Sequence, residues 1–258
     1  LVALDDPVTR FIPEWKDLAV FSAGVGPYLT TPVKRPMQMV DLLRHTSGLT
    51  YGFQTRTNVD AAYRKLKLAE AAGPLDMDGF VDALAKLPLE FSPGEAWNYS
   101  ISTDVLGVLV QRISGQPFEQ FLQERIFGPL GMTETGFSVR EDQRARFAAC
   151  YQPTPQGGLT LQDDPETSAY LKTPNFHSGG GGLVSTADDY MKFCRMLSNR
   201  GELNGRRLIA PKTLKLMASN HLPGGQDLTN LSRSLFSEAT NAGVDRKSTR
   251  LNSSHMPV

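Results

Sequence analysis

The amino-acid sequence predicts a predominantly helical chain with few strands. Its hydrophobic core is large enough not to depend on disulfides or bound metals for stability. A length of 258 residues is enough for one large domain or two small ones. Along several segments apolar residues recur at intervals of three and four, which is typical of helices that bury one face. Glycine or proline ends these segments, as Gly115 and Gly201 do. Short extended pieces are expected before residue 37, and the turn-rich stretch around 152–158 is typical of a hairpin or surface loop.

The helices follow from this pattern in chain order. The segments predicted to be helical are 37–44, 59–72, 76–86, 102–114, 117–126, 187–200 and 211–219. A hydroxyl of Ser102 or Thr103 is expected to cap the fourth of them, and Ser185 or Thr186 the sixth. The side chains expected on buried faces include Met39, Val40, Leu43, Tyr63, Leu66, Phe80, Leu84, Leu87, Leu106, Leu109, Val110, Ile113, Phe118, Phe121, Leu122, Ile126, Tyr190, Phe193, Cys194 and Leu197.

The composition indicates which classes of binding partner can be expected. Lys plus Arg and Asp plus Glu both number 27, so nothing in the charge balance points to a nucleic acid or an anionic membrane. No apolar run is long enough to span a membrane, and no signal peptide is visible at the first residues, which leaves the compartment open. Cys150 and Cys194 either pair or stay free and buried.

Two stretches are candidates for a functional site. In the first, 91–107, a Pro-Gly turn leads through Tyr99 into an apolar helix, and the phenol is either a proton carrier or a core aromatic. His45 follows the first predicted helix, where it is either a cap or a site residue. In the second, 177–189, four consecutive glycines permit close backbone approach, but no Lys and Ser/Thr follow at the offsets of a phosphate loop.

Several motifs occur in the order expected for one family. They are Leu4-Asp-Asp-Pro-Val8, Leu42-Leu-Arg-His-Thr-Ser-Gly-Leu49, Phe91-Ser-Pro-Gly94, Tyr99-Ser100, Gly128-Pro-Leu-Gly-Met132, Gly180-Gly-Gly-Leu-Val-Ser-Thr186 and Leu208-Ile-Ala-Pro-Lys212. On these motifs the chain resembles the serine β-lactamase-related family, which includes class C β-lactamases, family VIII esterases and D-alanyl-D-alanine peptidases. The resemblance implies an α+β fold, a helical region beside an antiparallel sheet. Because both ends of a family chain supply that sheet, most of it is expected to be missing here, which leaves a mostly helical chain.

The resemblance also implies a mechanism with three motifs. A Ser-x-x-Lys turn supplies the nucleophile that becomes the acyl-enzyme, a tyrosine or serine motif relays protons, and a third motif on an edge strand lines the pocket. Tyr99 matches the catalytic tyrosine. No Ser-x-x-Lys occurs in the 258 residues, and it is expected upstream of Leu1, with the third motif beyond Val244. Neither a metal nor an organic cofactor is implied.

The remaining site residues are expected to bind substrate or to support the catalytic loop. These candidates are Trp97, Ser100, His45, Ser178 and Gly179. The triplet that begins at His177 precedes the Gly-rich segment, so it does not match the third motif, which follows that segment in the family.

The substrate is expected to be a small-molecule ester or amide. Class C β-lactamases carry Tyr-x-Asn, and Ile101 stands here in place of the Asn that binds the substrate amide. This favours an esterase or transacylase on small acyl esters. The alternatives are a β-lactamase or D-amino-peptidase, or a relative that only binds penicillin-like ligands. Without Ser-x-x-Lys and the third motif, the chain by itself is expected to be inactive.

The end of the chain is expected to be artefactual. Residues 245–255 resemble the conceptual translation of a sequencing-adapter oligonucleotide. We therefore interpret 1–244 as a partial family domain and 245–258 as a tail outside it.

Overall fold

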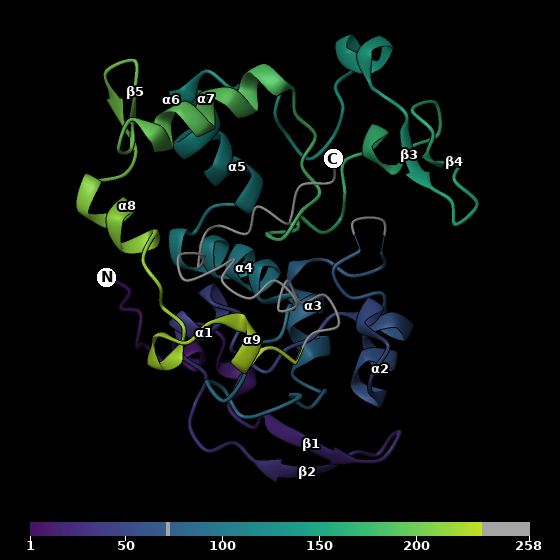
Figure 1. Ribbon diagram of the computed structural model, residues 1–258, viewed down its shortest axis with the longest axis vertical. Coiled ribbons are helices and arrows are strands. Elements are labelled where there is room, and N and C mark those ends of the chain that lie inside the picture. Colours follow the sequence, from purple (N-terminus) through teal and green to yellow (C-terminus); the bar gives the residue numbers. More distant parts are fainter. Residues whose placement is uncertain (71–72, 234–258) are drawn as a thin grey trace.

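The computed structural model describes residues 1–70 and 73–233, so the predicted tail at 245–258 lies outside the described residues. Figure 1 shows an α+β arrangement in which helices predominate and the strands are short. The helices are α1 (Met39–Leu43), α2 (Asn58–Leu66), α3 (Met77–Leu84), α4 (Ser102–Ser114), α5 (Phe118–Leu122), α6 (Gly128–Leu130), α7 (Ala187–Ser198), α8 (Pro211–Met217) and α9 (Leu228–Leu231). Short 3-10 turns lie at Val8–Arg10, Pro13–Trp15, Gly52–Gln54, Glu141–Arg146, Ala169–Leu171 and Pro223–Gly225, and a π-helical turn at Gln123–Phe127.

The strands form two-stranded antiparallel sheets. They are β1 (Ala19–Ala23) with β2 (Leu29–Pro32), β3 (Cys150–Pro153) with β4 (Leu159–Asp163), and β5 (Glu202–Leu203) with β6 (Arg206–Arg207). The first two pairs confirm the extended pieces before residue 37 and the hairpin around 152–158. Gly157, at φ 84°, lies between β3 and β4, in a left-handed conformation that glycine adopts without steric cost.

The main core surrounds α4, which lies in the middle of the molecule with α1, α2, α3 and the β1–β2 hairpin on one side (Figure 1). Val105, Val108 and Leu109 of α4 are at most 1 % exposed, and burial of such a side chain contributes about 1.5–3 kcal/mol. A second cluster joins α6, α7 and β5, and a third packs Trp97 against Leu222 and later residues. The Ser47 hydroxyl, between α1 and α2, lies 2.7 Å from the Ser102 hydroxyl, so this segment lies against the start of α4.

Several local expectations are wrong. Neither Ser102 nor Thr103 caps α4: the N-cap residue is Ile101, without a side-chain bond, because the Ser102 hydroxyl is held by Ser47 and Ser100 instead. The second predicted helix ends earlier than residue 72.

That early end follows from local backbone conformation. Helix α2 closes at Leu66, and Lys67 takes a left-handed conformation with φ 52°. The expected buried faces also include four exposed side chains: Leu43, Leu66, Ile113 and Tyr190 are 52, 38, 43 and 40 % exposed. Met196, which the pattern did not single out, is the buried side chain of α7 in the second cluster.

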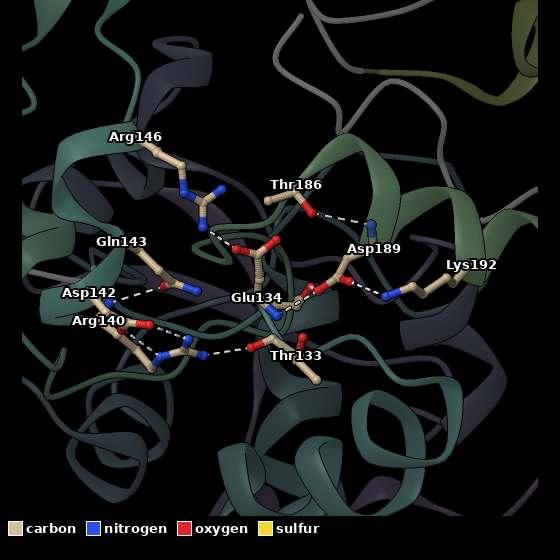
Figure 2. Close-up of polar contacts among 10 residues, drawn as sticks. Thr133, Glu134, Arg140, Asp142, Gln143, Arg146, Thr186, Asp189 and Lys192 are labelled. Atoms are coloured by element: carbon tan, nitrogen blue, oxygen red, sulfur yellow. Dashed lines mark hydrogen bonds and ion pairs between the residues drawn. The ribbon is translucent and has the colours of Figure 1, made fainter.

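Hydrogen bonds and an ion pair connect the loop after α6, which contains Glu134, to the start of α7 (Figure 2). The Thr186 hydroxyl accepts from the Asp189 backbone N–H at 3.2 Å, which confirms the predicted cap. The Asp189 carboxylate accepts from the Glu134 backbone N–H at 2.7 Å and from Lys192 Nζ at 2.7 Å. Burial alone would raise the pKa of Asp189, but these bonds hold it below its usual range. The network thus joins two segments about fifty residues apart in sequence.

The structure also bears on the two cysteines and on membrane-spanning helices. Cys150 and Cys194 are both free thiols and half-buried. Within the described ranges, no helix combines the length and apolar character needed to cross a bilayer.

Candidate active site

The backbone around Tyr99 is fixed by a loop that follows α1. The Asn98 N–H donates to the His45 carbonyl at 2.9 Å, and the Ile101 N–H donates to the Thr50 carbonyl at 3.2 Å. The buried Gln54 amide donates to the Tyr99 carbonyl at 2.9 Å. These bonds hold the chain on both sides of Tyr99, so the phenol is presented from a rigid connection at the start of α4.

Four rings surround the Tyr99 side chain. Its centroid lies 5.1 Å from that of Tyr51, 5.4 Å from His45, 6.1 Å from Phe53 and 6.4 Å from Trp97. These separations are within the 4.5–7 Å range of favourable aromatic pairs. The structure therefore brings together His45, Trp97 and Tyr99, which the sequence had marked as site residues, and adds two rings that it had not.

A hydrogen bond joins the His45 ring of this aromatic cluster to Ser100. His45 Nδ1 lies 3.2 Å from the Ser100 hydroxyl, which lies 2.8 Å from the Ser102 hydroxyl. The three side chains are buried, so this polar chain supports the Tyr99 loop from inside. His45 is held at φ 56°, a left-handed conformation that costs a non-glycine residue about 1–3 kcal/mol.

Asp104, in the first turn of α4, is a buried carboxyl that sequence reasoning missed. It is 1 % exposed and accepts hydrogen bonds from the Tyr51 hydroxyl at 3.3 Å, from the Gly180 N–H at 3.3 Å, and from the Ser178 hydroxyl. Burial disfavours its charged form more than these bonds favour it, and the pKa of Asp104 rises to about 6. An acidic residue in a first helical turn is usually an exposed partner of the helix dipole, so its position in sequence gave no sign of burial.

Ser178 and Gly179 lie against the first turn of α4, next to Asp104. The Ser178 hydroxyl donates to Asp104 of α4 and accepts from the Gly180 N–H at 3.1 Å, so it links the Gly-rich loop to the start of α4. A Cβ on Gly179 would lie 2.2 Å from the Thr103 carbonyl oxygen, which explains why this loop can approach α4 only with glycine there. Tyr51 joins the two groups, because its ring contacts Tyr99 and its hydroxyl contacts Asp104.

The phenols of the site are held in their neutral form. Burial raises the pKa of Tyr99, and the nearby Asp104 carboxyl raises it further. Burial, then the Asp104 charge, raises the pKa of Tyr51 in the same way. A neutral phenol can donate a proton at neutral pH, whereas a role as a base requires a neighbouring cation that lowers the pKa.

Comparison with known proteins assigns the chain to a family. A family model described as Beta-lactamase matches residues 1–241. The chain belongs to the Beta-lactamase family. An uncharacterized protein of Mycobacterium tuberculosis is 42% identical over 226 residues, which are 87% of this chain and 55% of the relative. Esterase EstB of Burkholderia gladioli is 32% identical, over 74% of this chain and 49% of the esterase, and the lovastatin esterase of Penicillium rubens is 31% identical, over 86% and 54%.

Solved structures agree with this assignment. Simvastatin Synthase (LovD) from Aspergillus terreus, unliganded, superimposes with a TM-score of 0.68 at 29% identity, covering 86% of this chain and 53% of that structure. EstCE1, described as a hydrolase with promiscuous acyltransferase activity, superimposes with a TM-score of 0.68 at 26% identity, covering 85% and 57%. The α+β fold and the family predicted from the motifs are therefore confirmed.

The chain spans about half the length of the curated relatives it matches. Its family contains serine hydrolases with esterase and acyltransferase members. The roles of Tyr99 and of the candidate substrate-binding residues stay predictions.

Proposed function

We propose that the protein carrying this chain is a serine hydrolase that acts on small acyl esters through an acyl-enzyme. Tyr99 relays the proton to the leaving group. The nucleophilic serine and its lysine come from sequence outside these 258 residues, since no Ser-x-x-Lys occurs among them. The named esterases among the relatives support this assignment.

The observation that carries the proposal is the setting of the Tyr99 phenol. It lies in a ring of aromatic side chains at the start of α4, on a loop that three long-range hydrogen bonds to residues 45–54 hold in place. Its raised pKa keeps the proton on the oxygen, as a donor to a departing alkoxide requires. A lysine brought against the phenol by the acylating motif would lower that pKa and allow the reverse transfer.

The position of Ile101 supports an ester over a β-lactam substrate. Its side chain is fully buried beneath the loop, so neither its chemistry nor its location suits recognition of an amide side chain. Hydrolysis of β-lactams or D-amino-peptides is the runner-up. The acyltransferases among the relatives favour adding an alcohol acceptor to the assay, because an acyl-enzyme can pass its acyl group to an alcohol as well as to water.

The test uses the full-length protein and p-nitrophenyl acetate. An acyl-enzyme predicts a burst of p-nitrophenol followed by a steady rate. Tyr99→Phe is expected to lower kcat by about 10²–10⁴-fold, the usual contribution of a proton-transfer group. Tyr151→Phe, which removes a hydroxyl from an exposed tyrosine on β3, is the matched control and should keep wild-type turnover.

Wild-type turnover by Tyr99→Phe would overturn the role of this residue. Penicillin hydrolysis without ester hydrolysis would favour the runner-up, and binding of penicillin without turnover of either substrate would favour a non-catalytic relative. The 258-residue chain alone should form no acyl-enzyme. Ester turnover by that chain, lost in Tyr99→Phe, would contradict this expectation.

A further inference from the structure

Asp104 presents its two carboxyl oxygens to two different segments of the chain. Its Oδ1 accepts from the Ser178 hydroxyl and from the Gly180 N–H, both in the Gly-rich loop. Its Oδ2 accepts from the Tyr51 hydroxyl at 3.3 Å, on the loop after α1. Because the side chain is 1 % exposed, bulk water has little access to either oxygen. The carboxyl is therefore the point at which the start of α4 holds both neighbouring loops.

The bonds to the Gly-rich loop also fix the direction of the second oxygen. A carboxyl group without such bonds turns through a broad range about its terminal torsion. Two donors on Oδ1 restrict that torsion and leave Oδ2 directed at the Tyr51 hydroxyl. At neutral pH the carboxyl is mostly ionised, since its pKa is about 6, and an ionised carboxylate accepts on both oxygens. Its ionised form thus matches the three donors around it.

Gly180 covers the contact between Asp104 and Tyr51. A Cβ at this position would lie 3.0 Å from Asp104 Oδ2 and 3.1 Å from the Tyr51 hydroxyl. It would also lie 2.8 Å from Thr103 Oγ1, so a side chain fits here only if its neighbours move. A Cβ on the next residue, Gly181, would meet nothing within 4 Å. The hydrogen bond from Tyr51 to Asp104 is therefore enclosed by the backbone of the Gly-rich loop.

Tyr51 passes this restraint to Tyr99. The two ring centroids are 5.1 Å apart and the planes differ by 42°, so the Tyr51 ring forms one wall of the space that holds the Tyr99 phenol. The bond at the Tyr51 hydroxyl fixes the end of this side chain that lies furthest from the backbone. If that bond is lost, the Tyr51 ring can tilt and the Tyr99 ring can follow it. Proton transfer requires a donor and an acceptor within about 2.6–3.2 Å, so a small tilt of the phenol is enough to slow it.

We propose that Asp104 is a positioning residue for the proton relay, which holds Tyr99 in place through the hydroxyl and ring of Tyr51. This inference rests on the proposed function and adds to it a residue that does not touch the ester. Loss of the bond from Tyr51 to Asp104 should therefore lower kcat and leave KM unchanged. The alternative is that the Asp104 charge acts directly on the phenol, and a variant without the charge separates the two.

The test measures turnover of p-nitrophenyl acetate by the full-length protein at neutral pH. Tyr51→Phe removes only the hydroxyl, and kcat should fall about 3- to 30-fold, with KM within about 2-fold of the wild type. Asp104→Ala should give a similar loss, and the double variant should be no slower than either single variant. Losses that multiply in the double variant would overturn the proposal, because the two residues would then act separately. Tyr151→Phe is again the matched control for the loss of a tyrosine hydroxyl.

Asp104→Asn separates position from charge. The amide can direct its oxygen at the Gly-rich loop and donate from its nitrogen to the Tyr51 oxygen, so both contacts can form without the charge. This variant should restore most of the turnover that Asp104→Ala loses. A loss as large as that of Asp104→Ala would overturn the proposal, because the charge of Asp104 would then act on the phenol directly.

Two neighbouring glycines supply a matched pair of variants that keep both Tyr51 and Asp104. The methyl of Gly180→Ala would press on the bond between these two side chains, and kcat should fall about 3- to 30-fold. Gly181→Ala adds the same methyl where nothing lies within 4 Å, and it should keep wild-type turnover. In the Tyr99→Phe background Gly180→Ala should cause no further loss, whereas a merely structural effect would persist there. Equal turnover by the two alanine variants, or a loss that persists without the phenol, overturns the proposal even if Asp104→Ala does not fold.

A readout without chemistry distinguishes failure of this proposal from failure of the proposed function. Protein whose tyrosines are labelled at Cζ for carbon NMR reports the surroundings of the Tyr99 phenol, and Tyr99→Phe assigns its signal. Gly180→Ala should move that signal, and Gly181→Ala should not. If the wild type hydrolyses no ester but the signal moves in this way, the proposed function falls and the positioning of Tyr99 stands. If the wild type hydrolyses the ester and Gly180→Ala changes neither kcat nor the signal, the positioning role falls and the proposed function stands.

Discussion

Asp104→Asn tests whether the buried carboxyl opposes folding once it is charged. Its pKa rises from an ordinary value of 3.8 to about 6, with burial as the largest cause. A raised pKa in the folded protein means that the unfolded chain loses this proton first. The stability associated with the neutral carboxyl is therefore fully present below pH 3.8 and is lost as the pH rises through 6.

The size of this effect follows from the two pKa values. Each pKa unit corresponds to about 1.4 kcal/mol, so ionisation of Asp104 should remove about 3 kcal/mol from the free energy of unfolding between acid and neutral pH. Most of the loss should fall between about pH 4 and pH 6. Asparagine has the same shape but does not titrate, and its stability relative to the wild type should rise by about that amount across this interval.

The assay is urea unfolding of the wild type and Asp104→Asn in the full-length protein at pH 4, 5, 6 and 7. Taking the difference between the two proteins removes the contributions of the other titrating groups. Asp188→Asn, a change at an exposed carboxyl in the first turn of α7, is the control and should show no such trend. A difference that stays constant from pH 4 to pH 7 would refute the reasoning, because Asp104 would then ionise equally in the folded and unfolded protein.

Two further pairs of variants test the packing of the Gly-rich loop and the network in Figure 2. Gly179→Ala should lower the free energy of unfolding by about 1–3 kcal/mol, because its Cβ would lie 2.2 Å from the Thr103 carbonyl oxygen. Gly181→Ala, whose Cβ would meet nothing within 4 Å, should be nearly neutral, and equal losses in the two variants would contradict this account. Asp189→Ala should cost about 1–3 kcal/mol in urea unfolding, since it leaves the backbone N–H of the half-buried Glu134 without its acceptor. The exposed Asp188→Ala should cost less than about 1 kcal/mol, and a larger loss there than at Asp189 would argue against the network.

Local patterns in the sequence predicted most of the helices. Asp76 and Thr186 begin α3 and α7 by accepting the N–H bonds of a helix cap, and such bonds form between residues three positions apart. Leu84 faces the core because helical spacing repeats over a few residues. The end of α2 was missed because Lys67 takes a left-handed conformation that its type does not predict.

Contacts between distant segments decided the site. Ser102 could have capped α4, but a buried serine on the loop after α1 took its hydroxyl, and only the fold brings those two segments together. The motif marked Tyr99, whereas Tyr51, Phe53 and Asp104 carried no local signal of their own. Their roles depend on burial and on neighbours some fifty residues away in sequence, or more.

The sequence by itself therefore determined the family, most of the helices and the catalytic tyrosine candidate, since these depend on motifs and short-range periodicity. The tertiary structure alone decided which side chains surround that phenol and which carboxyl is buried beside it. The physical reason is that desolvation and ring contacts arise only when the loop after α1, the start of α4 and the Gly-rich loop pack against one another.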